Sequence, residues 1–298
     1  MKRKNPPFRG CGTALITPFT KDGIDHAAWK GLIDRQLEAG VDALIVLGTT
    51  GEPSTLSVEE MLSLVREAVS QTRGRVPVIV GVGGNNTAQS ILRSKQVRDL
   101  GADCLLSVTP YYNKTTQAGL IAHYTALADA TELPMILYNV PARTGLNLAC
   151  DTMDVLADHP RIVALKEASA DITQIGEFFA RCHDRVALYS GCDDHVMAFM
   201  SLGGEGVISV LSNLMPKPMA DMTHAYLKGD AETARNLQLR LYALARAIFW
   251  EVNPIPVKAA MYHLGLCEDT VRLPLVPMSE GARARLLRLV EDYPDPFV

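Results

Sequence analysis

The sequence lacks the features of a membrane protein or a nucleic-acid-binding protein. None of its apolar runs approaches the ~18 residues that a membrane-spanning helix needs. Its net charge of −4 at pH 7 provides no basic surface of the kind that attracts nucleic acid or anionic lipid. We therefore expect neither a nucleic acid nor a membrane as a partner.

Signals for metal and nucleotide binding are also missing. No two of the six cysteines stand at CxxC spacing and no cluster of histidines accompanies them, so a zinc site is not expected. Scattered cysteines in a chain of this size are typical of reduced thiols in the cytoplasm, which is the predicted location. The glycine-rich segment at residues 81–86 lacks the third glycine of a dinucleotide fingerprint. We predict no metal, nucleotide or prosthetic group.

Three of the first five residues are basic, but Pro6 and Pro7 follow them rather than an apolar segment. A secretory signal requires such a segment, so this stretch is interpreted as a frayed terminus.

Apolar, β-rich runs alternate with amphipathic segments over most of the chain. With 48% hydrophobic residues in 298, the protein can bury a large core. The near-continuous apolar runs are typical of parallel strands covered on both faces, with helices as crossovers. One crossover, residues 58–70, begins with Ser57 as N-cap and Glu60 at the third helical position. The expected strands are residues 13–17, 43–47, 76–82, 103–108, 135–139, 162–166, 186–190 and 206–210.

Eight such strand and helix pairs in about 230 residues predict an α/β fold of the (β/α)8 TIM-barrel type. An open doubly wound sheet is the alternative, but it would call for the missing fingerprint. Beyond the eighth strand the pattern is helical only. We predict a barrel over residues 8–230 and a helical extension over residues 231–298 that packs on it.

Lys166 ends the sixth apolar strand, where an ammonium group would lose its water. A lysine that reaches out of the strand end or pairs with Glu167 is the ordinary explanation. The functional explanation is a desolvated amine with a lowered pKa that attacks a carbonyl and forms a Schiff base. The residues at neighbouring strand ends favour the second.

Active sites of such barrels gather at the carboxyl ends of the strands. The second strand is followed by Thr49 and Thr50 between glycines, a turn whose hydroxyls and amides could hold a carboxylate or simply cap a loop. The fifth strand ends with Tyr138, next to Lys166 on the adjacent strand, and Arg143 follows on a tight turn. A phenol can carry protons to an imine, and an arginine can bind a carboxylate.

Two further strand ends are less specific. Tyr111 and Tyr112 follow the fourth strand, and paired tyrosines are more often packing or interface residues than catalysts. Asp193 and Asp194 follow the seventh strand without a third carboxylate for a metal. They are predicted to cap the helix at residues 195–202.

The ordered set of motifs resembles the dihydrodipicolinate synthases within the pyruvate-dependent class I aldolases and lyases. The resemblance runs from about Phe8 to about Tyr293 and rests on residues 48–52, 109–113, 138–145, 166–168, 206–209 and 253–258.

The resemblance implies a role for each of these residues. Lys166 would form the Schiff base with pyruvate and Tyr138 would exchange protons, with Thr49 and Tyr112 completing a relay. Tyr111 matches the tyrosine that crosses a subunit interface. The remaining residues would bind substrate: Thr50 and the backbone at Ile208 for pyruvate, Arg143 for the carboxylate of L-aspartate 4-semialdehyde, and Gly191 as a further substrate-binding position.

The implied reaction condenses these two substrates to 4-hydroxy-tetrahydrodipicolinate on the route to diaminopimelate and lysine, in a homotetramer built as a dimer of dimers. Arg143 favours it over relatives that cleave N-acetylneuraminate or 2-keto-3-deoxy sugar acids, since these generally have an uncharged residue there. A barrel that binds a keto acid without turnover is a further alternative. Weak or absent inhibition by lysine is expected, because Val58, Met61 and Gln89 replace the imidazole and charged groups of inhibited relatives, although Asn85 and Tyr111 match.

Overall fold

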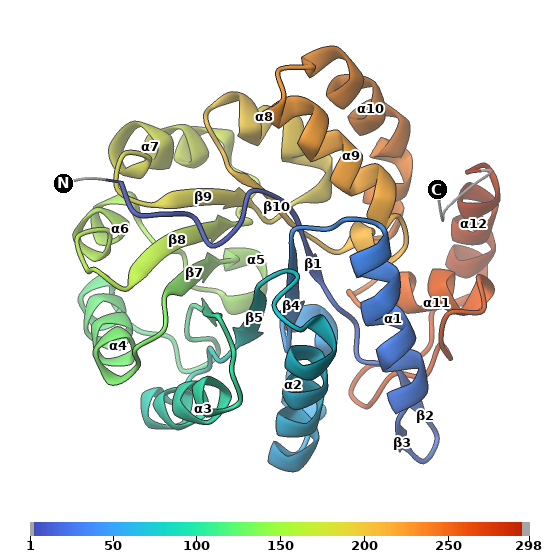
Figure 1. Cartoon of the computed structure of the whole chain (residues 1–298), viewed down its shortest axis with the longest axis horizontal. Coiled ribbons are helices and arrows are strands. Elements are labelled where there is room, and N and C mark those ends of the chain that lie inside the picture. Colours follow the sequence, from blue (N-terminus) through green and yellow to red (C-terminus); the bar gives the residue numbers. More distant parts are fainter. Residues whose placement is uncertain (1–2, 294–298) are drawn as a thin grey trace.

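Eight parallel strands close into a barrel in the computed structural model, which describes residues 3–293. Neighbours around the barrel follow the order β1-β10-β9-β8-β7-β6-β5-β4, and β1 pairs with β4 to close it. The barrel strands are β1 (Gly10–Ala14), β4 (Ala43–Val46), β5 (Val78–Gly81), β6 (Cys104–Val108), β7 (Met135–Asn139), β8 (Ile162–Glu167), β9 (Ala187–Ser190) and β10 (Gly206–Ser209). The predicted (β/α)8 fold is confirmed (Figure 1).

Helices surround the barrel and cover the outer face of its strands (Figure 1). The predicted capping box of α2 is present: Ser57 accepts from the backbone of Glu60, whose carboxylate accepts from the backbone of Ser57. The crossover helices are α1 (His26–Glu38), α2 (Val58–Thr72), α3 (Thr87–Asp99), α4 (Gln117–Ala130), α5 (Pro141–Thr144), α6 (Cys150–Leu156), α7 (Ile172–Cys182), α8 (Val196–Ser201) and α9 (Pro216–Leu227). A short antiparallel pair, β2 (Phe19–Thr20) and β3 (Gly23–Ile24), precedes α1.

The first strand lies three residues earlier than predicted, at Gly10–Ala14 rather than 13–17. Glycines are depleted in strands, so Gly10 and Gly12 hid its start. The barrel requires Gly12, because a Cβ atom there would lie 2.7 Å from the Phe8 ring and 2.8 Å from Ile45 Cδ1. The glycine therefore marks a close approach inside the barrel rather than a loop.

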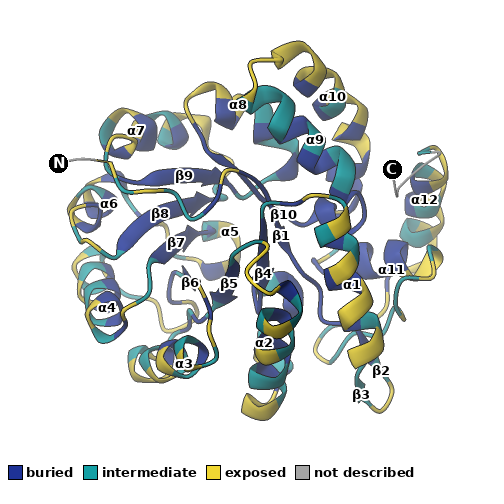
Figure 2. Ribbon diagram, viewed as in Figure 1, coloured by how far each residue is buried: buried dark blue, intermediate teal, exposed yellow. Residues whose placement is uncertain are grey.

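The predicted helical extension is formed by α10 (Ala231–Ala247), α11 (Ile255–His263) and α12 (Glu280–Glu291). Buried residues of these helices, such as Leu244 and Met261, share one hydrophobic cluster with Cys11 of β1 and Val207 of β10. Figure 2 shows the buried faces of the helices turned towards the barrel and their exposed faces outwards. The extension thus continues the barrel core, and the boundary at residue 230 stays a prediction.

The terminus is not frayed from Arg3 onwards, contrary to the prediction. Lys4 Nζ donates to the carbonyls of Ala157, His159 and Ile162 at 2.6, 2.6 and 2.8 Å, and Arg3 pairs with Glu205 at 2.6 Å. The basic residues alone could not show this, because the carbonyls that Lys4 contacts lie more than 150 residues further along the chain. Residues 1 and 2 lie outside the described part of the chain.

Within residues 3–293, none of the helices combines the length and the apolar character that crossing a bilayer requires.

Candidate active site

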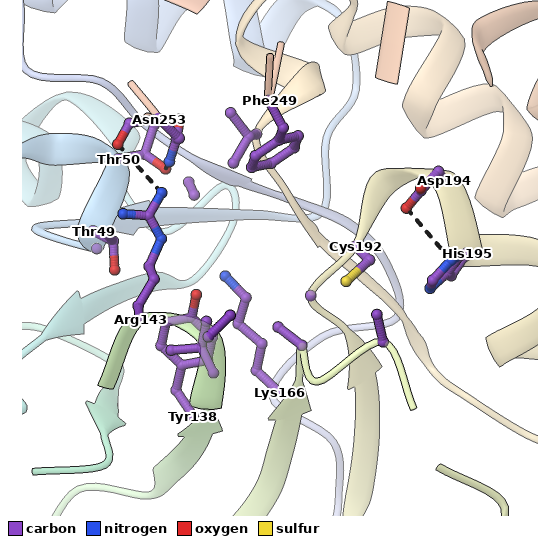
Figure 3. Close-up of a pocket in the computed structure, with 18 of the residues that line it drawn as sticks. Thr49, Thr50, Tyr138, Arg143, Lys166, Cys192, Asp194, His195, Phe249 and Asn253 are labelled. Atoms are coloured by element: carbon purple, nitrogen blue, oxygen red, sulfur yellow. Dashed lines mark hydrogen bonds and ion pairs between the residues drawn. The ribbon is translucent and has the colours of Figure 1, made fainter. Parts of the chain in front are cut away.

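Lys166 lies near the end of β8 with its amine inside the mouth of the barrel (Figure 3). Its side chain is 5% exposed and Nζ lies 4.2 Å from the centre of the Tyr138 ring. Burial lowers the pKa of Lys166 to about 8, and the neighbouring Asp193 carboxylate opposes part of this change. Roughly a tenth of the amine is then neutral at pH 7, which is sufficient for a nucleophile.

Tyr138 stands beside Lys166 because β7 and β8 are adjacent and the two residues are register partners. Burial raises the pKa of Tyr138 to about 12, although the nearby Arg143 guanidinium and a hydrogen bond with the Thr49 hydroxyl act in the opposite direction. The phenol is therefore protonated at neutral pH and can give a proton to an adjacent group.

Thr49 and Thr50 form a 3-10 turn, η1 (Thr49–Gly51), directly after β4. The turn is held by the segment that follows β1, where Thr17 Oγ1 donates to the Gly51 carbonyl at 2.7 Å. It ends at Glu52, a non-glycine residue in the left-handed region with φ of 51°. Both threonines line the same cavity as Lys166.

Arg143 sits on α5 and reaches back over the cavity mouth towards Thr50 and Asn253 (Figure 3). Its Nη2 donates to the Asn253 carbonyl at 3.3 Å. The guanidinium also contributes to lowering the pKa values of Lys166 and Tyr138. It can bind an anion and at the same time favour the neutral amine.

Gly191 follows β9 at a point where backbone and side chains crowd together. A Cβ atom there would lie 2.6 Å from Ala168 Cβ, 3.0 Å from the Glu167 carbonyl oxygen and 3.1 Å from Lys166 Cε. A glycine is therefore needed for the lysine side chain to pass. Ile208, in contrast, is buried in the barrel interior on β10, while Val210 beyond it lines the cavity.

The cavity has a volume of about 340 Å³, suited to a small substrate. A second cavity of about 390 Å³ adjoins it and shares Thr49, Tyr138 and Arg143 in its wall. The sequence analysis assigned no site role to the part of the wall that comes from the helical extension, because the motif at residues 253–258 does not by itself show that this segment returns to the strand ends. These residues are Ala245, Arg246, Phe249, Trp250 and Asn253.

The two tyrosines after β6 take up different positions. Tyr111 lines the second cavity, beside Thr49 and Tyr138. Tyr112 is 90% exposed and has a φ of 68°. A single chain therefore brings Tyr111, and not Tyr112, to the cavity that Tyr138 lines.

The capping role predicted for Asp193 and Asp194 is wrong, since α8 begins at Val196, its N-cap residue is His195, and no side chain caps it. Asp193 is buried instead and accepts from the backbone of Val210 and Leu211 at 3.1 and 3.0 Å, which orders the loop after β10. Asp194 accepts from Arg246 at 3.1 Å. Tertiary partners thus outweighed the local signal for a helix start.

Cys192, Asp194 and His195 bring three potential ligand atoms within 4.8 Å of one another. Burial raises the pKa of Cys192 to about 12, so the thiol is protonated at neutral pH. Since Asp194 is already paired with Arg246, we assign no metal to this group.

Comparison with known proteins decides between the possible families. The model of the dihydrodipicolinate synthetase family matches residues 7–293. The chain belongs to this family. The resemblance predicted from the sequence motifs is therefore confirmed.

Relatives in the dihydrodipicolinate synthetase family are similar over nearly their whole length. The 4-hydroxy-tetrahydrodipicolinate synthase of Geobacter sulfurreducens is 48% identical, over 96% of this chain and 99% of its own. A crystal structure of the enzyme from Thermotoga maritima has a TM-score of 0.94 and 42% identity, over 96% of this chain and 98% of its own. A dihydrodipicolinate synthase described as the first monomeric variant matches with a TM-score of 0.93 and 43% identity, over 96% of both chains.

Proposed function

We propose that this protein condenses pyruvate with L-aspartate 4-semialdehyde to 4-hydroxy-tetrahydrodipicolinate, with Lys166 as the Schiff-base residue. The observation that carries the proposal is a buried amine of lowered pKa, 4.2 Å from the ring centre of a protonated phenol in a cavity of substrate size. Family membership supports the same reaction and its place in lysine and diaminopimelate biosynthesis.

The first half of the reaction builds a nucleophile from pyruvate. The neutral Lys166 amine attacks the C2 carbonyl carbon, and the carbinolamine loses water to give an imine. Tyr138 supplies the proton that the departing hydroxyl needs. The Tyr138 phenolate left by that step then takes a proton from the methyl carbon, which gives an enamine, with the charged imine nitrogen as electron acceptor.

The second half joins the substrates and releases the enzyme. The enamine carbon attacks the aldehyde carbon of the semialdehyde, whose carboxylate binds to Arg143. The amino group of the semialdehyde then attacks the former C2 carbon and displaces the Lys166 amine, which closes the ring. One water is released overall, at the imine step.

We assign pyruvate carboxylate binding to Thr50 and the backbone near Gly191 and Ile208, and the proton relay to Thr49, Tyr138 and a tyrosine from the loop after β6. Since Tyr111 already lies by the cavity and Tyr112 is 90% exposed, Tyr112 is the residue free to cross to another subunit, which reverses the order expected from the motif. The proposed assembly is a homotetramer of two dimers. The proposed location is the cytoplasm, in keeping with six cysteines that are all free.

Borohydride reduction in the presence of pyruvate tests the first half. Mass spectrometry should locate a pyruvate-dependent adduct on Lys166 and none on Lys258, a second buried lysine that is paired with Glu52. An adduct elsewhere, or none, would favour a barrel that only binds a keto acid. Comparing the semialdehyde with 2-keto-3-deoxy sugar acids and N-acetylneuraminate as substrates then tests the second half.

A further inference from the structure

Asn253 contacts both residues to which we assign substrate carboxylates. It lies between α10 and α11, in the wall of the cavity, and its side chain is 5% exposed. Its Nδ2 donates to Thr50 Oγ1 at 3.0 Å, and its backbone carbonyl accepts from Arg143 at 3.3 Å. Figure 3 shows the three side chains converging above Lys166.

The hydrogen bond from Asn253 determines what Thr50 can do. A threonine hydroxyl has one proton to donate and two lone pairs that accept. Because the amide donates to Thr50 Oγ1, one lone pair is occupied and the proton must point elsewhere. Within residues 3–293 the structure gives Thr50 Oγ1 this donor and no acceptor for its proton.

A carboxylate accepts hydrogen bonds and cannot donate them. A hydroxyl whose proton points into the cavity therefore matches the pyruvate carboxylate, whereas one that presents a lone pair would repel it. We propose that Asn253 is a positioning residue, which orients the Thr50 proton towards the pyruvate carboxylate. This inference rests on the proposed function of Thr50 in pyruvate binding.

The other end of the amide supports this role. Asn253 Oδ1 is buried and has no hydrogen-bond partner in the described part of the chain. Buried polar atoms without partners are costly and uncommon. A purely structural role would be expected to satisfy both polar atoms of the amide. Here only Nδ2 has a partner, and that partner is the Thr50 hydroxyl in the cavity wall.

Comparing Asn253→Asp with Asn253→Ala separates the orientation of the Thr50 proton from the mere loss of the Asn253 side chain. Aspartate has nearly the same shape but only accepts, so it would take up the Thr50 proton and turn a lone pair towards pyruvate. Alanine removes the donor and leaves the hydroxyl able to rotate. We expect KM for pyruvate to rise roughly tenfold or more with aspartate and clearly less with alanine. With alanine, KM for the semialdehyde should change little, since the backbone carbonyl that holds Arg143 remains.

Thr50→Val provides the control, because the introduced carboxylate could also repel pyruvate by charge alone. In a Thr50→Val background, the change to aspartate should raise KM for pyruvate no further than the change to alanine does. Thermal unfolding of each variant, and borohydride trapping on Lys166 at saturating pyruvate, would verify that the fold and the amine are intact.

Two results would overturn the positioning role alone: alanine raising KM for pyruvate as much as aspartate, or the full aspartate effect persisting without the Thr50 hydroxyl. If Thr50→Val by itself left KM for pyruvate unchanged, the proposed role of Thr50 would fail and the inference with it.

Discussion

Lys258 Nζ lies 2.5 Å from Glu52 Oε1, and both side chains are buried. Lys258 comes from α11 and Glu52 directly follows the turn that carries Thr49 and Thr50, so the pair ties the helical extension to the active-site turn. The ammonium also donates to the Thr270 carbonyl at 2.9 Å and lies 4.2 Å from the centre of the Phe19 ring. Two buried lysines thus differ in their surroundings: Lys258 is paired with a carboxylate, whereas the Lys166 amine lies over the ring of Tyr138.

Replacing one partner of the Lys258–Glu52 pair should destabilise the protein more than replacing both. Glu52→Gln leaves the Lys258 charge buried without its partner, and we expect it to lower the free energy of unfolding by about 3 kcal/mol. The double variant with Lys258→Met should recover part of that loss. Chemical denaturation of the three variants measures both effects, and a double variant less stable than Glu52→Gln would contradict the argument.

The rate of imine formation should depend on pH through Lys166. Since burial lowers the pKa of Lys166 to about 8, the amine is neutral and reactive above that pH and is lost as a nucleophile below it. We expect kcat/KM for pyruvate to rise about tenfold per pH unit up to about pH 8 and then to level off. An unbroken rise to pH 10 would show that the amine keeps its ordinary pKa.

Tyr138→Phe should separate binding from proton transfer. Without the phenol, the proton steps lose their donor, and turnover should fall about 10²- to 10⁴-fold. Lys166 should still be trapped by borohydride with pyruvate, although more slowly. Tyr124→Phe is the matched control, because Tyr124 is also buried but lies on α4 with its hydroxyl towards the Ser107 carbonyl. Equal losses in the two variants would argue against a catalytic phenol.

Arg143→Ala should weaken use of the semialdehyde much more than use of pyruvate. The guanidinium lines the cavity mouth and can form two parallel hydrogen bonds with a carboxylate. We expect KM for the semialdehyde to rise roughly tenfold or more, and Arg143→Lys to give a smaller rise because it keeps the charge without the fork. Steady-state kinetics with each substrate varied would decide, and equal changes for both substrates would count against this role.

Lysine should inhibit this enzyme weakly or not at all. The positions that correspond to imidazole and charged groups in inhibited relatives are held by exposed Val58, buried Met61 and exposed Gln89. A cationic amino acid finds no charged partner in these three side chains. Activity measured over a lysine titration tests this, and strong inhibition at sub-millimolar lysine would refute it. Gln89→Glu, which adds a carboxylate, should strengthen any inhibition.

The fold and the centre of the site could be predicted because they depend on local pattern and strand order. Eight apolar runs fix eight parallel strands, and adjacency of β7 and β8 places Tyr138 beside Lys166. Asn253 and Phe249 could not be found in the same way, because a chain segment that returns from the helical extension has no fixed register with the strand ends. The sequence could not predict which of Tyr111 and Tyr112 faces the cavity, because the side chains of neighbouring loop residues can point in opposite directions.

The order in which the chain is synthesised matters for the barrel floor. Phe8 stacks on Tyr189 with ring centres 4.4 Å apart, and Arg3 and Arg9 both pair with Glu205. Arg3, Phe8 and Arg9 are therefore synthesised well before their partners Tyr189 and Glu205, which lie almost two-thirds of the way along this sequence or later. A nascent chain that stops before Tyr189 has an unsealed barrel, so the buried surroundings of the Lys166 amine are completed late in synthesis.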